Sequence, residues 1–223
     1  MTSITTTAAA PAEATTPKYG AAFFEHLWRG AGVQSVAFFL IGLAVYTIVP
    51  DVGAYIAAPI LGLAILNLTW WMAALRTTLA DHGLDGWGAA GTTAAAGVAG
   101  MLLVLVALGV TIASVADTAD PALVAGLTTF GSAAWVLSSF PRAMFVMAGS
   151  FGFWRAQLIT NRQFVVAVGL VILGVLGGTT LFADGIWSPT GALSLIILPA
   201  LELVWVVAVS RVLNRAPSTR TGF

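Results

Sequence analysis

The sequence is unusual first for what it lacks. The chain of 223 residues has no cysteine, one lysine and two histidines, and only 8% of its residues are charged. Without cysteine it has no disulfide, no thiolate nucleophile and no cysteine-based metal site. The HExxH, GxSxG and GxxxxGK motifs are also missing, which removes the usual signatures of zinc hydrolases, serine hydrolases and phosphate-binding loops. We therefore expect a protein that is not an enzyme and that holds no cofactor.

The shortage of charge also argues against a water-soluble fold. Soluble globular proteins carry about 25% charged residues, and this chain has far too few to cover a surface in water. Its formal net charge of zero leaves no basic face to neutralise phosphates, which argues against a nucleic-acid partner. The solvent for most of the chain must be a lipid bilayer.

Apolar residues make up 59% of the sequence and fall into six runs separated by short polar gaps. A hydrocarbon core of about 30 Å needs roughly 20 helical residues, and a helix satisfies its own backbone hydrogen bonds in lipid. Each run is therefore predicted to be a transmembrane helix. The six runs cover residues 32–49, 52–75, 89–115, 122–140, 164–183 and 190–210.

The charges in the gaps between the runs alternate in sign. All nine Lys and Arg residues lie before the first run or after the second, fourth and sixth, whereas the other gaps hold only aspartate. Because Lys and Arg beside membrane spans stay on the cytoplasmic side, this alternation predicts six crossings with both termini inside. The basic residues are Lys18, Arg29, Arg76, Arg142, Arg155, Arg162, Arg211, Arg215 and Arg220, and the acidic gaps hold Asp51, Asp117, Asp120 and Asp184.

These features predict an all-α membrane protein, a bundle of six transmembrane helices over residues 19–215 in the plasma membrane of a bacterium. Residues 1–18 and 216–223 lack apolar periodicity and are predicted to be disordered cytoplasmic tails. Residues 21–29 mix aromatic and charged side chains, which is typical of an interfacial helix on the inner surface. The expected partners are the bilayer and either other membrane subunits or further copies of the chain, since small-xxx-small spacings in the third and fifth runs allow close helix packing.

One segment has several possible structures. Residues 143–154 are apolar but too short to cross, and Arg142 and Arg155 flank them. A crossing here would place one of these arginines outside and reverse every later span. The segment is therefore an inner interfacial piece, a re-entrant piece, or a continuation of the fourth helix beyond a bend at Pro141.

Glu202 is the acid that lies inside a predicted span. It precedes Arg211 by nine residues, on the order of 14 Å of helix, which places it near the bilayer midplane. A charge there costs roughly 2.5 to 3.5 kcal/mol unless it is paired. Asn67 precedes Arg76 by nine residues in a parallel helix, so the two should share a depth and hydrogen-bond if their helices face each other. Pro199 lacks a backbone donor and should loosen the helix just above the acid.

The roles of these candidates remain open. Glu202 is either a coupling site for protons or cations, or an acid that only joins helices, and we slightly favour the second because no other buried charge is evident. Arg142 is the natural counter-charge, but at the predicted inner boundary its long stem favours snorkelling to water over a buried pair with Glu202. The binding or coupling candidates are Glu202, Asn67 and Arg142.

A metal site is not predicted, although Glu25, His26 and the loop at residues 81–85 (DHGLD) carry possible ligands, because their spacing matches no metal motif. The sequence favours a non-enzymatic multi-pass subunit, or a membrane protein that binds a lipid or another apolar ligand among its helices. The alternative is a small proton- or cation-coupled transporter or channel that uses Glu202.

Overall fold

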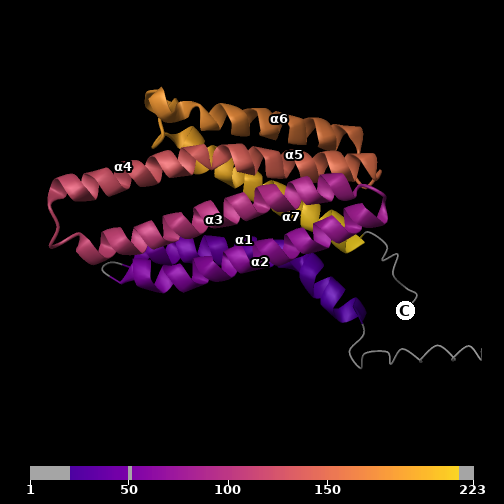
Figure 1. The fold of residues 1–223 in the computed structure, drawn as a ribbon, viewed down its shortest axis with the longest axis horizontal. Coiled ribbons are helices and arrows are strands. Elements are labelled where there is room, and N and C mark those ends of the chain that lie inside the picture. The colour runs from indigo at the N-terminus through magenta and orange to yellow at the C-terminus, as the bar shows by residue number, and fades with distance from the viewer. Residues whose placement is uncertain (1–20, 50–51, 216–223) are drawn as a thin grey trace, which may run out of the picture.

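The fold is described over residues 21–49 and 52–215 in a computed structural model, and these residues form helices and connecting turns without any strand (Figure 1). The predicted tails and Asp51 lie outside the described residues. The elements are α1 (Ala21–Ile48), α2 (Gly53–Asp81), α3 (Asp85–Val115), α4 (Pro121–Leu137), α5 (Ser139–Arg155), α6 (Asn161–Gly178), the short turns η1 (Thr180–Phe182) and η2 (Gly185–Trp187), the π-helical segment η3 (Leu193–Ile197), and α7 (Leu198–Arg215).

Six helical segments of the described chain are long and apolar enough to cross a membrane, which confirms the predicted number of spans. The fourth of them runs from Pro121 to Arg155, because α5 continues α4 with a break only at Ser138. Residues 143–154 are therefore a continuation of the fourth helix, and the interfacial and re-entrant alternatives are wrong. Pro141 lies in the first turn of α5, where its missing N–H is tolerated.

The interfacial helix predicted at residues 21–29 is not a separate element. These residues form the first turns of α1, which continues unbroken to Ile48. In Figure 1 the indigo start of α1 leaves the bundle at an angle, while the rest of the helix lies along it. Its apolar and charged mixture suits a helix end that emerges from lipid.

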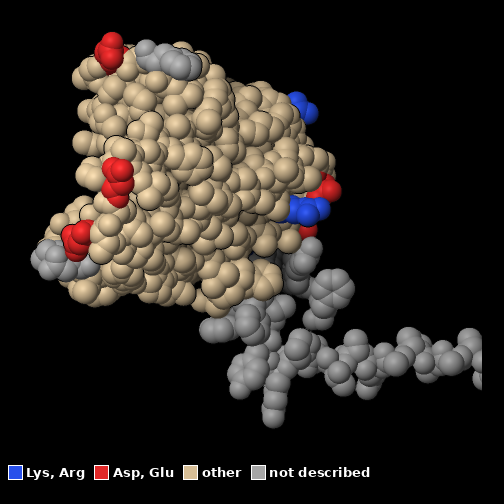
Figure 2. All heavy atoms as spheres, turned by 60° about the vertical axis from the view of Figure 1, so that its left-hand side comes forward, with Lys and Arg blue, Asp and Glu red and all other residues tan. Residues whose placement is uncertain are grey.

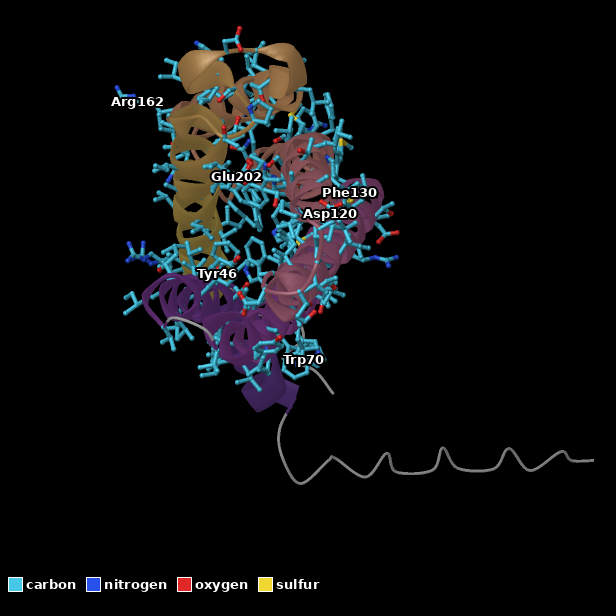
Figure 3. The ribbon with its side chains drawn as sticks, turned by 90° about the vertical axis from the view of Figure 1, so that its left-hand side faces the viewer. Tyr46, Trp70, Asp120, Phe130, Arg162 and Glu202 are labelled. Carbon is cyan, nitrogen blue, oxygen red and sulfur yellow. The ribbon has the colours of Figure 1, made fainter. Side chains whose placement is uncertain are left out.

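The spans form a ring in which each helix packs against its neighbours in sequence. Contacts join α1 to α2, α2 to α3, α3 to α4 and α5, α5 to α6, and α6 to α7, and α7 closes the ring against α1. Figure 3 views this ring from one end, with α7 opposite α4. The short connections leave consecutive spans antiparallel, as expected from the short polar gaps.

Local signals in the sequence set where the helices begin and end. The Asp120 carboxylate accepts from the Ala122 backbone N–H at 2.8 Å, just before Pro121 opens α4. Gly83 ends α2 with a positive φ of 73°, a conformation that glycine adopts without strain. These stops keep the turns short and fix the register between adjacent spans.

The two ends of the bundle differ in charge. The loops with Asp117, Asp120 and Asp184 share one end, which we call the acidic end. The opposite, basic end carries the exposed Arg155 and Arg162 with other arginines, next to the acids of the α2–α3 turn. Figure 2 shows only red groups at one end of the molecule, and blue groups together with red ones at the other.

The packed core lies in the half of the bundle nearer the basic end. Trp71, Phe145 and Trp205 meet there edge to face, with ring centroids 5.2 to 5.9 Å apart. Small residues allow α6 to approach α5, since a Cβ added at Gly174 would lie 3.0 Å from the Ala143 Cβ. The spacing predicted in the fifth run thus serves packing within the chain. The half nearer the acidic end is looser and contains a cavity that is partly open to the surroundings.

Candidate ligand-binding site

Arg142 and Glu202 form an ion pair inside the bundle. Arg142 Nη1 donates to Glu202 Oε2 at 2.8 Å, and the two side chains are only 7% and 14% exposed. Arg142 comes from α5 and Glu202 from α7, which run in the same direction. The expectation that Arg142 snorkels to water is therefore wrong, and the buried pair is the alternative that holds. The physical reason is that the fourth span continues past Pro141, so Arg142 lies within it instead of at its end.

The guanidinium of Arg142 is held from two other sides. Its Nη2 donates to Ser139 Oγ at 2.7 Å. Its Cζ lies 4.3 Å from the centre of the Trp135 ring, which is a cation–π contact. Its Nε is buried and has no hydrogen-bond partner. A buried donor without a partner costs free energy, so this nitrogen can gain from an acceptor that enters the site.

Trp135 connects the ion pair to the acidic end. Its indole N–H donates to the backbone carbonyl of Ser194 at 2.8 Å, and Ser194 Oγ lies 3.2 Å from Thr180 Oγ1. Ser194 belongs to the π-helical segment η3, which leads into Pro199 and then Glu202. The helix is therefore loosened just before Glu202, as Pro199 predicted, and the loosened part is this π-helical segment. Such π-helical turns often mark functional positions.

Two neighbouring cavities lie in this part of the bundle. The smaller, about 90 Å³, has Arg142 and Glu202 in its wall, and the larger, about 410 Å³, lies toward the acidic end. The walls of both include Phe39, Ile65, Leu102 and Trp135. Figure 3 shows Glu202 on the side of α7 that faces the other helices. The larger volume falls in the range of small-molecule sites, about 300 to 1,000 Å³.

Asn67 does not join the pair. Its side chain is buried, but Nδ2 donates to the carbonyl of Leu63 in its own helix at 2.8 Å. The expected hydrogen bond between Asn67 and Glu202 is not formed, and the acid instead accepts a charged donor from Arg142. Four hydroxyl side chains of the second and fourth spans likewise bond to carbonyls of their own helices, namely Thr69, Thr128, Thr129 and Ser132.

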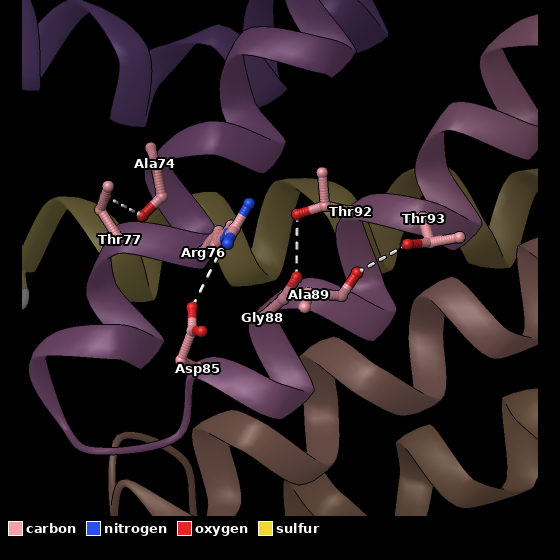
Figure 4. A network of polar contacts seen from close by, with 8 residues as sticks. All are labelled: Ala74, Arg76, Thr77, Asp85, Gly88, Ala89, Thr92 and Thr93. Carbon is pink, nitrogen blue, oxygen red and sulfur yellow. Dashed lines mark hydrogen bonds and ion pairs between the residues drawn. The ribbon is translucent and has the colours of Figure 1, made fainter.

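The α2–α3 turn at the basic end holds the residues considered for a metal. Asp85 faces Arg76 at 3.5 Å, with both side chains about half exposed or more (Figure 4). His82 Nδ1 lies 2.8 Å from the carbonyl of Thr78. Among the residues that the structure describes, no three His, Asp or Glu side chains gather as a metal site would require. The side chains of Glu25 and His26 lie outside this description. The exposed ion pair of Arg76 and Asp85 contributes little to stability.

The sequence did not indicate that Trp135 and Ser139 contact the ion pair, or that Arg142 lies inside a span. A signal for the depth was present, since Arg142 precedes Arg155 by 13 residues and Glu202 precedes Arg215 by 13. Both spans run toward the basic end and finish at those arginines. Equal spacing from the same end of parallel helices places the two charges at one level.

Fold and site together define the class as a multi-pass helical membrane protein with a charged pair in its interior. The chain matches no protein-family model, and comparison with curated proteins and with solved structures gives no match either. The site must therefore be interpreted from its own chemistry.

Proposed function

We propose that this is a non-enzymatic membrane protein that binds a lipid or another largely apolar molecule inside its helix ring. The observation that carries the proposal is the cavity of about 410 Å³, whose wall is apolar apart from a few hydroxyl groups and Trp135. Thr128 and Ser132 in that wall already donate to their own helices. A wall of this kind offers contact to a hydrocarbon chain and little to a hydrated ion.

The ion pair weighs against the alternative of a proton- or cation-coupled transporter. Such a transporter needs a carboxylate that can accept its ion, and Glu202 already contacts the fixed cation of Arg142. The pair has no net charge, which lowers the cost of keeping both groups within a membrane. We therefore assign the pair to the wall of a binding site.

Filling the cavity should abolish ligand binding. Gly109 lines the larger cavity, and a Cβ added there meets only Tyr46, at 3.9 Å. In Gly109→Phe the ring should occupy the ligand volume and reduce the lipid retained per protein at least about tenfold, equal to about 1.4 kcal/mol. The measurement is mass spectrometry of the lipid extract from purified protein.

The matched control lies on the same helix. Gly100 is exposed, and a Cβ added there meets nothing within 4 Å. Gly100→Phe should therefore retain as much lipid as the unmodified protein. Equal retention in the two variants would show that bound lipid surrounds the helices and does not occupy the cavity, which contradicts the proposal.

We also propose that the basic end faces the cytoplasm of a cell membrane. The support is the separation of charge between the two ends of the bundle (Figure 2) and the retention of Arg and Lys on the inner side. Because the chain has no cysteine, single cysteines report topology without a background.

Thr118→Cys, in the exposed α3–α4 loop, should react with a membrane-impermeant maleimide on intact cells. His82→Cys, in the exposed α2–α3 turn, should react only after the cells are opened. The readout is the mass shift of the purified protein. Labelling of His82→Cys on intact cells would reverse the proposed orientation.

A further inference from the structure

The smaller cavity reaches the ion pair, and Arg142 and Glu202 are the charged residues in its wall. Two other polar groups in this wall already have hydrogen-bond partners. Ser35 Oγ donates to the Ala64 carbonyl, and the Trp205 indole N–H donates to Ser150 Oγ. Arg142 and Glu202 remain. Arg142 has the unpartnered Nε, and within the described residues Glu202 accepts a hydrogen bond only through Oε2.

Together these two side chains hold one unpartnered donor and one further acceptor at the ion pair. Arg142 Nε is fully buried, so a small movement of the guanidinium would bring it to a ligand oxygen, and the second carboxylate oxygen of Glu202 can accept from a ligand O–H. Glu202 is 14% exposed at its side chain and stands in the cavity wall, so part of it is open to a small molecule. A hydroxyl group both donates and accepts, and it satisfies both positions at once.

The charge of the site restricts the head group further. One cation and one anion cancel, so a neutral ligand leaves the interior neutral. A carboxylate or an ammonium would add an uncompensated charge within lipid, which is costly. The site should therefore discriminate strongly against both charged head groups.

We propose, on the basis of the ligand-binding function above, that the ligand is an uncharged long-chain amphiphile with a hydroxyl head group. The head group bonds to Arg142 and Glu202, and the chain fills the larger cavity past Trp135. Phe39, Ile65 and Leu102 line both cavities, so a chain that extends from one to the other would stay in contact with apolar side chains. The neutral pair selects the head group, and the cavity selects the hydrocarbon.

The test compares three photoactivatable probes with the same dodecyl chain and a diazirine on it, namely the alcohol, the acid and the amine. Each is added to the full chain in phosphatidylcholine vesicles, at an alkaline pH that ionises the acid. Labelled peptides are mapped by mass spectrometry, and labelling that persists in Gly109→Phe is subtracted as non-specific. The alcohol should label the cavity wall at least about tenfold more than either charged probe.

A change of charge at the site should change the preference. In Glu202→Gln, Arg142 has no anion, so the site carries a net positive charge and the acid should label it more than the alcohol. Equal labelling of the unmodified protein by all three probes overturns the head-group proposal but leaves the ligand-binding function standing. If no probe labels above the Gly109→Phe level, both fail. The probe series on the unmodified protein decides the question even where Glu202→Gln does not fold.

Discussion

Replacing Glu202 with leucine is expected to destabilise the bundle by about 3–5 kcal/mol, the usual cost of leaving a buried charge without its partner. Arg142 is the charge that would be stranded, since its side chain is 7% exposed and Glu202 is the anion in contact with it. A guanidinium stays protonated in proteins, so it cannot relieve the cost by losing its charge. Ser139 and Trp135 would still contact it, but neither carries a negative charge.

The effect of the opposite change should be smaller. In Arg142→Met the carboxyl group of Glu202 can take up a proton and become neutral. A guanidinium, in contrast, cannot become neutral by losing a proton. The double variant Arg142→Met with Glu202→Leu should recover most of the stability, because two apolar side chains replace a pair whose attraction is offset by desolvation. Stability is measured by unfolding in mixed micelles at increasing denaturing detergent.

The control for these variants is an exposed acid. Asp184→Asn, at the acidic end, should change stability by less than about 0.5 kcal/mol. A Glu202→Leu variant as stable as Asp184→Asn would show that the ion pair is not formed in the folded bundle. A double variant no more stable than Glu202→Leu would show that the cost arises from packing around residue 202.

The number of spans could be predicted because it depends on local composition. Each apolar run is long enough to specify a helix on its own, and Asp120 with Pro121 or Gly83 marks the ends without reference to other parts of the chain. Residues 143–154 are harder to place from the sequence, because taken by themselves they are too short to cross a membrane. In the structure they share a span with α4, and composition alone does not decide between this continuation and the other two alternatives.

The site was predicted only in part. Glu202 and Arg142 stand out in the sequence as ionisable groups in or beside apolar runs, and this chemistry is visible without a structure. Asn67 was a reasonable partner by depth, but a hydrogen-bond partner must also lie on the facing side of its helix. Asn67 instead bonds within α2. Which helix faces which is decided by the closure of the ring between α1 and α7, a contact between residues far apart in sequence.

The tryptophans illustrate the same limit. Trp70 and Trp71 are adjacent, and both lie near the predicted inner boundary, where indole rings commonly occupy the headgroup level. In the structure Trp70 is 45% exposed and Trp71 is fully buried. Trp71 packs against Phe145 and Trp205, and a Cβ added at Gly32 would lie 2.8 Å from its ring. Trp71 therefore joins α2 to α1, α5 and α7 at the centre of the core.

Trp71→Ala is expected to cost about 3 kcal/mol, whereas Trp70→Ala should cost less than about 1 kcal/mol. Trp71 is surrounded by protein, so its removal leaves a void whose walls lose their contacts. Lipid chains replace the contacts of the exposed Trp70. The expected cost lies at the lower end of the range known for soluble proteins, since in lipid the gain from transfer out of water is absent and the packing contribution remains. Both variants are compared with the unmodified protein by detergent-induced unfolding, and equal losses for the two would contradict the placement of Trp71 at the junction of four helices.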